Sequence, residues 1–428
     1  MYTDMTSVGS IILGGGRGTR LFPLTATRCK PAISFGGRYR LIDVPISNSI
    51  NSGIHKIFII SQFLSASLHK HLLQTYQFDR FSHGFLELLS AEQKPSQTAW
   101  YQGTADAVRQ NLEYFLETDC QYFCILSGDQ LYSIDFRDML SHAQATDADL
   151  TIAALPVKEE ECERMGVLKI DERQKITHFQ EKPKVATALS SLRTPQTLFH
   201  THNIPYTKGK DYLASMGIYL FKRKALFDLL TNNEGNDFGN HLIPAQIEKG
   251  RAYAYPHLGY WEDIGTIKSF YNANLALTTT PSQFDLFNES HRIYSAPYQL
   301  PGPQIANAHI SNAILCEGTR FDGREVSNSI LGIRSVVKKG CVIRNTLIIG
   351  NDSYTPPACE RNNFHKEWLI DENVHIENAI IDKNVYIGKN VRLTNEKKYQ
   401  TYDNNEIYVR DGITIVAKGA VIPDNFVF

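Results

Sequence analysis

The hexapeptide Ile310-Ser311-Asn312-Ala313-Ile314-Leu315 recurs sixteen residues later as Val326-Ser327-Asn328-Ser329-Ile330-Leu331. A looser third copy, VIRNTL, starts after another sixteen residues at Val342, and a fourth, IENAII, starts at Ile376 beyond an inserted Tyr- and Pro-rich stretch. Aliphatic residues that recur at a period near six, with Asn or Gly between them, indicate short parallel strands joined by tight turns. We therefore predict that the C-terminal third of the chain, residues 305–428, forms a left-handed parallel β-helix.

A proline-rich segment precedes the repeats. Residues 281–304 contain Pro281, Pro297, Pro301 and Pro303, and we predict that they link the β-helix to a larger N-terminal domain of residues 1–280. The aromatic side chains of this segment allow it to pack on either domain, so the linker need not be flexible.

The first 280 residues alternate short apolar runs with longer amphipathic ones, such as residues 105–116. This alternation predicts a largely parallel, Rossmann-like α/β domain with three layers, whose ligand site lies beyond the carboxyl ends of the strands. Four runs are predicted to be buried strands, because they are rich in β-forming residues and bounded by turn or polar residues: residues 10–13, 56–60, 122–126 and 150–154.

The composition excludes several classes of protein. A net charge of -1 over 428 residues does not suggest a nucleic-acid-binding surface. Seven cysteines without a C-x-x-C pair favour free thiols in a reducing, cytoplasmic setting. The first nine residues carry no basic side chain and do not resemble a signal peptide. No apolar run approaches the ~18 residues of a membrane span.

A glycine-rich turn follows the first predicted strand. It reads Gly14-Gly15-Gly16-Arg17-Gly18-Thr19-Arg20-Leu21, and Lys30-Pro31 comes ten residues after Arg20. Glycines allow backbone N–H groups to approach a triphosphate, and the arginine and lysine add positive charge. The turn matches neither the dinucleotide fingerprint, because Thr19 replaces its third glycine, nor the P-loop, because no G-K-[ST] follows.

The run from Leu13 through Pro31 resembles the opening signature of the sugar-1-phosphate nucleotidyltransferases. Five further blocks resemble those of the ADP-glucose pyrophosphorylase branch of this family, in the same order: residues 100–108, 127–129, 179–183, 215–219 and 260–266. The resemblance extends from Ile11 almost to Phe428 and includes the β-helix. Residues 39–43 and 273–275 are more similar to the cyanobacterial and plant members than to the enteric ones.

The resemblance implies an enzyme that makes ADP-glucose and pyrophosphate from ATP and glucose 1-phosphate for glycogen or starch synthesis. It also implies Mg²⁺ as cofactor, small anionic allosteric effectors and a homotetramer. Three alternatives remain at this point: a pyrophosphorylase that uses another nucleoside triphosphate, a non-catalytic regulatory subunit, and an acyltransferase, since hexapeptide β-helices often carry that activity. Retention of the family's charged residues argues against the second alternative. The short repeat region, without an evident catalytic His, argues against the third.

Transfer requires a phosphate oxygen of the sugar phosphate to attack the α-phosphorus of the nucleotide, in line with departing pyrophosphate. The attacking phosphate is already ionised at neutral pH, so the site needs positive charge and alignment rather than a general base. The family implies that Arg20 and Lys30 hold the triphosphate beside Gly15 and Gly16. Carboxylate oxygens are the ligands that Mg²⁺ prefers, and the family implies this role for Asp129 and Asp263.

The resemblance also implies a sugar pocket. Lys182 is expected to hold the phosphate of the sugar, and Tyr101, Gly166, Glu181 and Ser215 to line the pocket around the sugar ring. Taken alone, Asp129 could instead cap a helix, and Lys182-Pro183 could be a solvated turn. Gln130 departs from the family pattern, in which a histidine follows the metal-binding aspartate, so the surroundings of Asp129 are expected to differ.

Regulation depends on basic residues between the domains in this family. Lys418 and Arg392 match positions that the cyanobacterial and plant enzymes use, and Arg28 and Arg40 are candidates from the catalytic domain. Thr27 stands where the enteric enzymes carry the lysine for a sugar-bisphosphate activator, which argues against that effector. The alternative is that these side chains are solvated surface charges.

Overall fold

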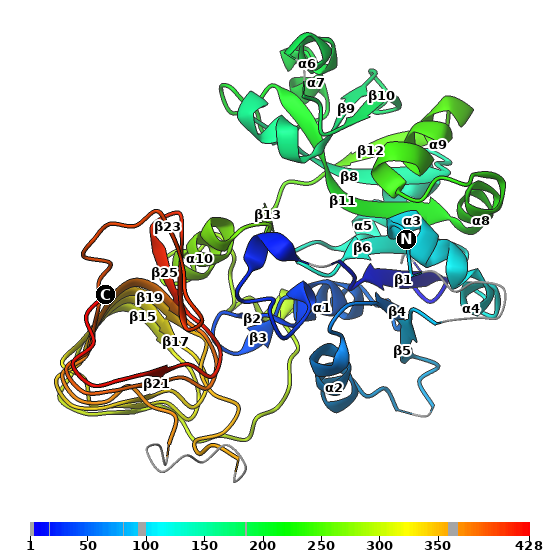
Figure 1. Ribbon diagram of the computed structural model, residues 1–428. Helices are drawn as coiled ribbons and strands as arrows, with labels where there is room; N and C mark the ends of the chain where they lie inside the picture. Colours follow the sequence, from blue (N-terminus) through cyan, green and yellow to red (C-terminus); the bar gives the residue numbers. More distant parts are fainter. Residues whose placement is uncertain (1–3, 17, 80, 93–99, 185, 358–366) are drawn as a thin grey trace.

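The computed structural model describes residues 4–16, 18–79, 81–92, 100–184, 186–357 and 367–428. Two bodies lie side by side, an α/β domain from the first two-thirds of the chain and a coil of stacked strands from the last third (Figure 1). Arg17 of the glycine turn and residues 358–366 of the inserted stretch lie outside the described part. No helix in the described ranges has the length and apolar character needed to cross a membrane.

The four predicted strands of the N-terminal domain are confirmed. They are β1 (Val8–Leu13), β4 (Lys56–Ser61), β6 (Tyr122–Ser127) and β8 (Leu150–Val157). Parallel pairing places β1 between β4 and β6, and β5 (Phe85–Ser90) extends the sheet beyond β4. Their aliphatic side chains are buried on both faces, as is typical of strands inside a parallel α/β sheet.

The other half of the nine-stranded sheet is mixed. The long strand β11 (Tyr212–Lys222) runs antiparallel to β6, β8 and β9 (Gly166–Ile170). Strand β10 (Ile176–Glu181) pairs with β9, and β12 (Ala252–Pro256) runs parallel to β8. The expectation of a largely parallel sheet is therefore correct for one half only, because β11 enters the sheet beside β6 in the opposite direction.

Helices cover both faces of this sheet (Figure 1). Buried apolar residues form a separate core cluster on each side. The predicted helical stretch 105–116 is divided at Asn111, whose side-chain amide donates to the Ala107 carbonyl at 2.8 Å. The principal helices are α1 (Asp43–Asn51), α2 (Ala66–Thr75), α3 (Thr104–Gln110), α4 (Leu112–Leu116), α5 (Phe136–Ala145), α8 (Arg223–Asn232), α9 (Ile243–Lys249) and α10 (Ile267–Ala276).

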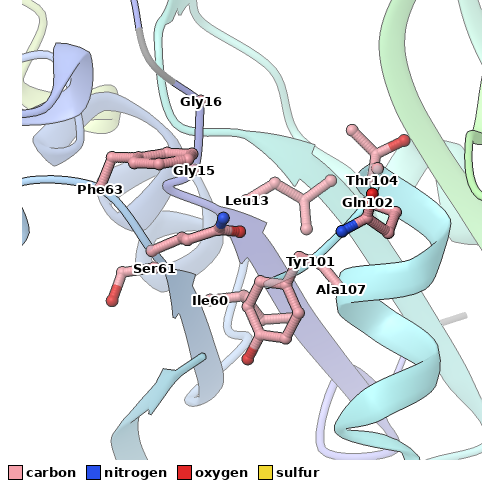
Figure 2. Close-up of a pocket in the computed structure, with 12 residues that line it drawn as sticks. Leu13, Gly15, Gly16, Ile60, Ser61, Phe63, Tyr101, Gln102, Thr104 and Ala107 are labelled. Atoms are coloured by element: carbon pink, nitrogen blue, oxygen red, sulfur yellow. The ribbon is translucent and has the colours of Figure 1, made fainter. Parts of the chain in front are cut away.

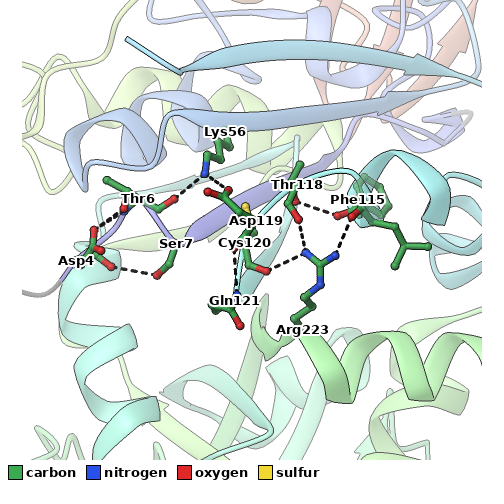
Figure 3. A network of polar contacts seen from close by, with 11 residues as sticks. Asp4, Thr6, Ser7, Lys56, Phe115, Thr118, Asp119, Cys120, Gln121 and Arg223 are labelled. Atoms are coloured by element: carbon green, nitrogen blue, oxygen red, sulfur yellow. Dashed lines mark hydrogen bonds and ion pairs between the residues drawn. The ribbon is translucent and has the colours of Figure 1, made fainter.

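The amino ends of the central strands are closed by hydrogen bonds to backbone carbonyl groups (Figure 3). Lys56 at the start of β4 donates to the Thr6 carbonyl at 3.0 Å and pairs with Asp119. Arg223 at the start of α8 donates to the carbonyls of Thr118 and Cys120 at 2.6 and 3.0 Å. These contacts occupy the segments before β1 and β6, so the carboxyl edge is the edge open to ligands.

The C-terminal third is a parallel β-helix, as predicted. The four repeat copies lie in β15 (His309–Leu315), β17 (Glu325–Leu331), β19 (Val342–Ile348) and β20 (His375–Ile381), stacked parallel and in register. Each strand turns a corner at its asparagine, which has a positive φ of 44–52°. Asn tolerates this left-handed backbone where branched residues do not, which explains the repeated Asn of the motif.

The segment between the domains is packed rather than free. Phe284 is buried against Phe35 and Tyr260, and the Tyr294 amide donates to the Ser47 hydroxyl at 2.8 Å. Helix α10 packs against β17 and β19 of the β-helix. The domain boundaries at residues 280 and 305 remain a prediction. Residues before position 280, such as those of α10, already pack against the β-helix.

Candidate active site

A cavity of about 340 Å³ opens at the carboxyl edge of the sheet. The residues that line it come from β-strands, from the 3₁₀ turns η1 (Thr19–Leu21) and η2 (Lys30–Ala32), and from the loops between them. The structure thus brings together eight side chains or glycines that the sequence predicts to act on substrates: Arg20, Lys30, Asp129, Gly166, Glu181, Lys182, Ser215 and Asp263.

Two short strands place the predicted metal ligands next to each other. Strand β7 (Gln130–Tyr132) pairs antiparallel with β13 (Trp261–Asp263), and in this register Asp263 lies opposite Gln130. Asp129 directly precedes β7, so its carboxylate meets that of Asp263 although 134 residues separate them. The alternative in which Asp129 caps a helix does not hold, because α5 is capped by Asp135.

Lys30 joins the two carboxylates. Its Nζ lies 2.6 Å from Asp129 Oδ2 and 3.8 Å from Asp263 Oδ1, and its side chain is buried. Burial by itself would raise the pKa of Asp129, but the Lys30 ammonium and the Ser127 hydroxyl outweigh it and lower the pKa. Burial raises the pKa of Asp263, the Lys30 charge opposes that rise and the charge of Asp129 adds to it. The site therefore contains two carboxylates that share one cation, the ammonium group of Lys30.

This pair of carboxylates fits a divalent cation. The negative charge of Asp129 contributes to the raised pKa of Asp263, and a hard cation between the two carboxylates would relieve that repulsion. No group of three or more His, Cys, Asp or Glu side chains suited to a metal occurs within the described ranges. Two protein carboxylates are nevertheless the usual protein share for Mg²⁺, which takes its other ligands from water and substrate phosphates.

Gln130 lines the same cavity as the two carboxylates and lies between Trp261 and Gly217. The Trp261 indole donates to Gln130 Oε1 at 3.4 Å, and Gly217, at φ 71°, leaves space on the other side of the Gln130 amide. A side chain at Gly217 would lie 3.1 Å from Gln130 Nε2. The glutamine that stands in place of the family's histidine is thus accommodated beside Asp129 by Trp261 and Gly217.

Two glycines, Gly166 and Gly239, lie against the Glu181 carboxylate. A Cβ at Gly166, which lies opposite Glu181 in the β9–β10 pairing, would stand 2.8 Å from Glu181 Oε2, and a Cβ at Gly239 would stand 2.7 Å from it. Any larger residue at either position would displace the carboxylate. Gly166 therefore leaves room for two side chains of β10, the Phe179 ring, which lies nearest, and the Glu181 carboxylate.

Lys182 adopts a backbone that non-glycine residues rarely use. Its φ is 45°, its amide donates to the Met165 carbonyl at 3.0 Å, and its Nζ pairs with Glu181 Oε1 at 2.9 Å. Such strain is found mostly at functional sites, where the surrounding structure maintains it. The Lys182 side chain lines the cavity, and 57% of its surface remains exposed to solvent.

Gly15, Gly16 and Tyr101 line a second cavity of about 210 Å³ (Figure 2). Its walls come from the ends of β1 and β4 and from the start of α3, and a Cβ at Gly15 or Gly16 would meet no atom within 4 Å. Gly16 has φ 114°, so a residue with a side chain would be strained there, and its side chain would occupy space in the cavity. Tyr101 is fixed by a hydrogen bond from Asn111 Nδ2 to its hydroxyl at 2.9 Å.

The structure thus separates Tyr101 from the other predicted sugar-pocket residues. Tyr101 stands with the glycine turn, whereas Gly166, Glu181 and Ser215 line the cavity of the carboxylates. The reason is topological: Tyr101 precedes α3 beside β1, and the other three residues belong to the antiparallel half of the sheet. One mostly apolar cavity and one mostly charged cavity therefore share the carboxyl edge.

Comparison with known families agrees with this arrangement. A family model described as nucleotidyl transferase matches residues 9–280, and a model described as the GLGC left-handed parallel beta-helix domain matches residues 298–427. The chain belongs to the nucleotidyl transferase family. The two models in succession are the signature of the ADP-glucose pyrophosphorylase-type sugar-1-phosphate nucleotidyltransferases, which confirms the resemblance seen in the sequence.

In this nucleotidyl transferase, one predicted regulatory residue joins the two domains. Arg28 donates two hydrogen bonds from one nitrogen to Asp382, at 2.6 and 2.8 Å, and both side chains are buried. Arg40 donates to the Ser67 carbonyl at 2.7 Å and is half-buried. The alternative of a solvated surface charge is therefore wrong for Arg28.

Lys418 lies beside a lysine that the sequence analysis missed. Lys383 is buried and pairs with Asp352 Oδ1 at 2.8 Å, and Lys418 Nζ lies 3.8 Å from the other oxygen of the same carboxylate. Desolvation opposes ionisation of Asp352, but the two lysines outweigh it and lower its pKa to about 2. The available signal was the repeat itself, since Lys383 stands in the copy DKNVYI where the copy DENVHI has Glu372.

Arg392 is not part of this cluster. It lies in β22 (Arg392–Leu393), opposite His375 of β20, and pairs with Glu396 at 3.1 Å. Lys418 follows β25 (Ile413–Val416), which is stacked on the second half of β20 beyond its corner. The two residues therefore lie on different faces of the coil and are not placed to hold one anion together.

Proposed function

We propose that this chain transfers the adenylyl group of ATP to glucose 1-phosphate, giving ADP-glucose and pyrophosphate. The observation that carries the proposal is the junction of Lys30 with Asp129 and Asp263 in the cavity that also holds Glu181 and Lys182. Lys30, proposed to bind the triphosphate, and Lys182, proposed to bind the sugar phosphate, thus line one cavity at the edge of the sheet. The match to the GLGC type of β-helix domain favours ATP and glucose 1-phosphate among the family's substrates.

The reaction needs no proton transfer. A phosphate oxygen of glucose 1-phosphate forms a bond to the α-phosphorus of ATP as the bond to the bridging oxygen breaks, and that oxygen leaves with pyrophosphate. Arg20 and Lys30 neutralise the triphosphate, and Lys182 aligns the attacking phosphate. Mg²⁺, when held by Asp129 and Asp263, supplies further positive charge to the reacting phosphates.

The choice of nucleotide tests the proposal. We expect kcat/KM for ATP to exceed that for UTP by more than tenfold, or about 1.4 kcal/mol. The measurement is pyrophosphate release from glucose 1-phosphate with each of the four common nucleoside triphosphates in turn. Equal or better use of UTP or dTTP would assign the chain to another branch of the family. No release with any of them, by enzyme that is folded, would favour a non-catalytic subunit.

Lys182→Gln is expected to act mainly on glucose 1-phosphate. The lysine meets a dianion that is bound in the ground state as well as in the transition state, so its loss raises KM with a smaller effect on kcat. We expect KM for glucose 1-phosphate to rise at least about tenfold, or about 1.4 kcal/mol. Lys184→Gln, two residues along the same exposed loop, is the matched control and should behave as wild type. If only the KM for ATP rose, Lys182 would bind the nucleotide and not the phosphate of glucose 1-phosphate.

We propose in addition that a small phosphorylated carboxylate activates the enzyme at Lys418 and Lys383. The ammonium groups of Lys383 and Lys418 already attract one carboxylate, that of Asp352, which supports the proposal that this cluster attracts anions. This cluster adjoins the Arg28–Asp382 pair between the domains, because Asp382 and Lys383 are neighbours. An effector with different affinities for two arrangements of the domains would shift the population between them.

Lys418→Ala should raise the effector concentration needed for half-maximal activation. The measurement is a titration of 3-phosphoglycerate and of fructose 1,6-bisphosphate against initial rate, in wild type, in Lys418→Ala and in Lys389→Ala. Lys389 is an exposed lysine of the same domain that pairs with Glu372, and its variant should titrate as wild type. Better activation by fructose 1,6-bisphosphate, or an unchanged titration of Lys418→Ala, would contradict the regulatory proposal and leave the catalytic one intact.

A further inference from the structure

The β-helix domain carries an antiparallel meander that does not follow the coil. Strands β23 (Thr401–Asp403), β24 (Ile407–Arg410) and β25 (Ile413–Val416) pair in sequence, and β25 also joins the coil by pairing with β20. The Ala417 amide donates to the Glu406 carbonyl at 2.8 Å and closes the base of the β24–β25 hairpin. The meander is therefore anchored at the coil and extends away from it.

The outer face of this hairpin reaches the turn that carries Arg20. The Tyr408 ring meets the Phe22 ring edge to face, with centroids 5.3 Å apart and planes at 88°. Phe22 directly follows η1, and its amide donates to the Thr19 carbonyl at 3.1 Å to end that turn. Beside this contact a cavity of about 810 Å³ separates the domains, with Arg20 on one wall and Arg410 on the other.

The position of Arg20 depends on the backbone of this short turn. The Arg20 guanidinium lies beside Gly265, two residues after Asp263, and its charge acts on the carboxylates of Asp129 and Asp263. Turn η1 has only three residues and follows Gly18, whose backbone is left-handed. Such a turn is marginal alone, so it depends on surrounding contacts, which include the hydrogen bond from the Thr25 hydroxyl to the Gly18 carbonyl at 3.0 Å and the packing of its apolar neighbours. Leu21 is buried in the catalytic domain, whereas Phe22 is 40% exposed and has Tyr408 as its aromatic partner.

We infer that Tyr408 is a positioning residue: through Phe22 it holds the turn of Arg20 at the active-site cavity. The inference rests on the proposed function, in which Arg20 meets the triphosphate. It makes the β-helix domain part of nucleotide binding, in addition to any regulatory role. Tyr408 packs against the core that the two domains share, so its ring is itself well fixed.

The test uses the full-length chain. Tyr408→Ala should raise KM for ATP about three- to tenfold, the range expected for loss of an aromatic pair, with KM for glucose 1-phosphate and kcat within about twofold of wild type. Tyr408→Phe retains the ring and should behave as wild type. In the double variant Phe22→Ala/Tyr408→Ala, KM for ATP should be no higher than in Phe22→Ala alone, because the contact is already lost.

A purely structural role would affect all kinetic constants together and would lower the thermal midpoint in proportion. A parallel change in all kinetic constants would overturn the inference. So would an unchanged KM for ATP in Tyr408→Ala, or additive effects in the double variant. If Tyr408→Ala does not fold, Phe22→Leu tests the same contact from the other domain with the same expected split. Equilibrium binding of ATP to the same variants gives the result without turnover. Failure of wild type to make a sugar nucleotide would therefore count against the proposed function alone.

Discussion

Replacing Asp129 by Asn lowers kcat by at least about two orders of magnitude and leaves the fold intact. A neutral amide is a poor ligand for Mg²⁺, and it no longer balances the charge of Lys30, which lies 2.6 Å away. The fold survives because the side chain is a quarter exposed and an amide oxygen can still accept the hydrogen bond from Ser127. Initial rates at saturating substrates, over a titration of Mg²⁺, measure the effect.

The matched control is Asp147→Asn. Asp147 is also an ion-paired carboxylate, but it is exposed and pairs with Lys222 and Arg251, outside both cavities. Its variant should keep the kcat of wild type. Turnover of Asp129→Asn within about tenfold of wild type would refute the metal-binding role of Asp129.

Replacing Asp382 by Ala lowers the free energy of unfolding by about 3–5 kcal/mol. Removal of one member of a buried ion pair leaves the other charge without a partner in a poorly solvated place, and the Arg28–Asp382 pair is almost completely buried. Urea unfolding, followed by signals from both domains, measures the change. The two domains should then unfold at different urea concentrations, because the pair joins a residue of one domain to a residue of the other, 354 positions away.

Glu372→Ala is the control for this prediction. Its ion pair with Lys389 at 3.0 Å is half exposed, and such pairs contribute little to stability. Replacing both members of the buried pair by apolar residues, as in Arg28→Met/Asp382→Leu, should recover much of the loss. A loss below about 1 kcal/mol for Asp382→Ala would mean that the pair does not hold the domains together.

The β-helix was predictable because its signal is local and repeated. Each Asn at a corner and each aliphatic residue on a face occurs at a fixed spacing, so four weak copies support one another. The meander of β23–β25 was not predicted, because it interrupts the repeat with strands that pair antiparallel and leave no periodic pattern. The direction of β11 was also not predictable, since the apolar run of a buried strand is the same in either direction.

The active site was predictable as a set of residues but not as an arrangement. The family resemblance supplied Asp129 and Asp263, yet only the pairing of β7 with β13 shows that they meet at Lys30. Tyr101 lies beside the glycine turn, in a different cavity from the other residues predicted for the sugar pocket, and its role stays a prediction. Contacts between distant segments decide such placements, and the sequence carries no local record of them. The repeat marks Lys383 as a position that varies between copies, but its pairing with Asp352, thirty-one residues away, is visible only in the structure.

The central claim is that the α-phosphorus of ATP is transferred to glucose 1-phosphate. The most direct test supplies the enzyme with Mg²⁺, glucose 1-phosphate and ATP labelled with ³²P at either the α- or the γ-phosphate, in the presence of equal unlabelled UTP. We expect the α-label in ADP-glucose and the γ-label in pyrophosphate, in equal amounts and only when glucose 1-phosphate is present. Release of the γ-label without glucose 1-phosphate, or UDP-glucose as the main product, would contradict it.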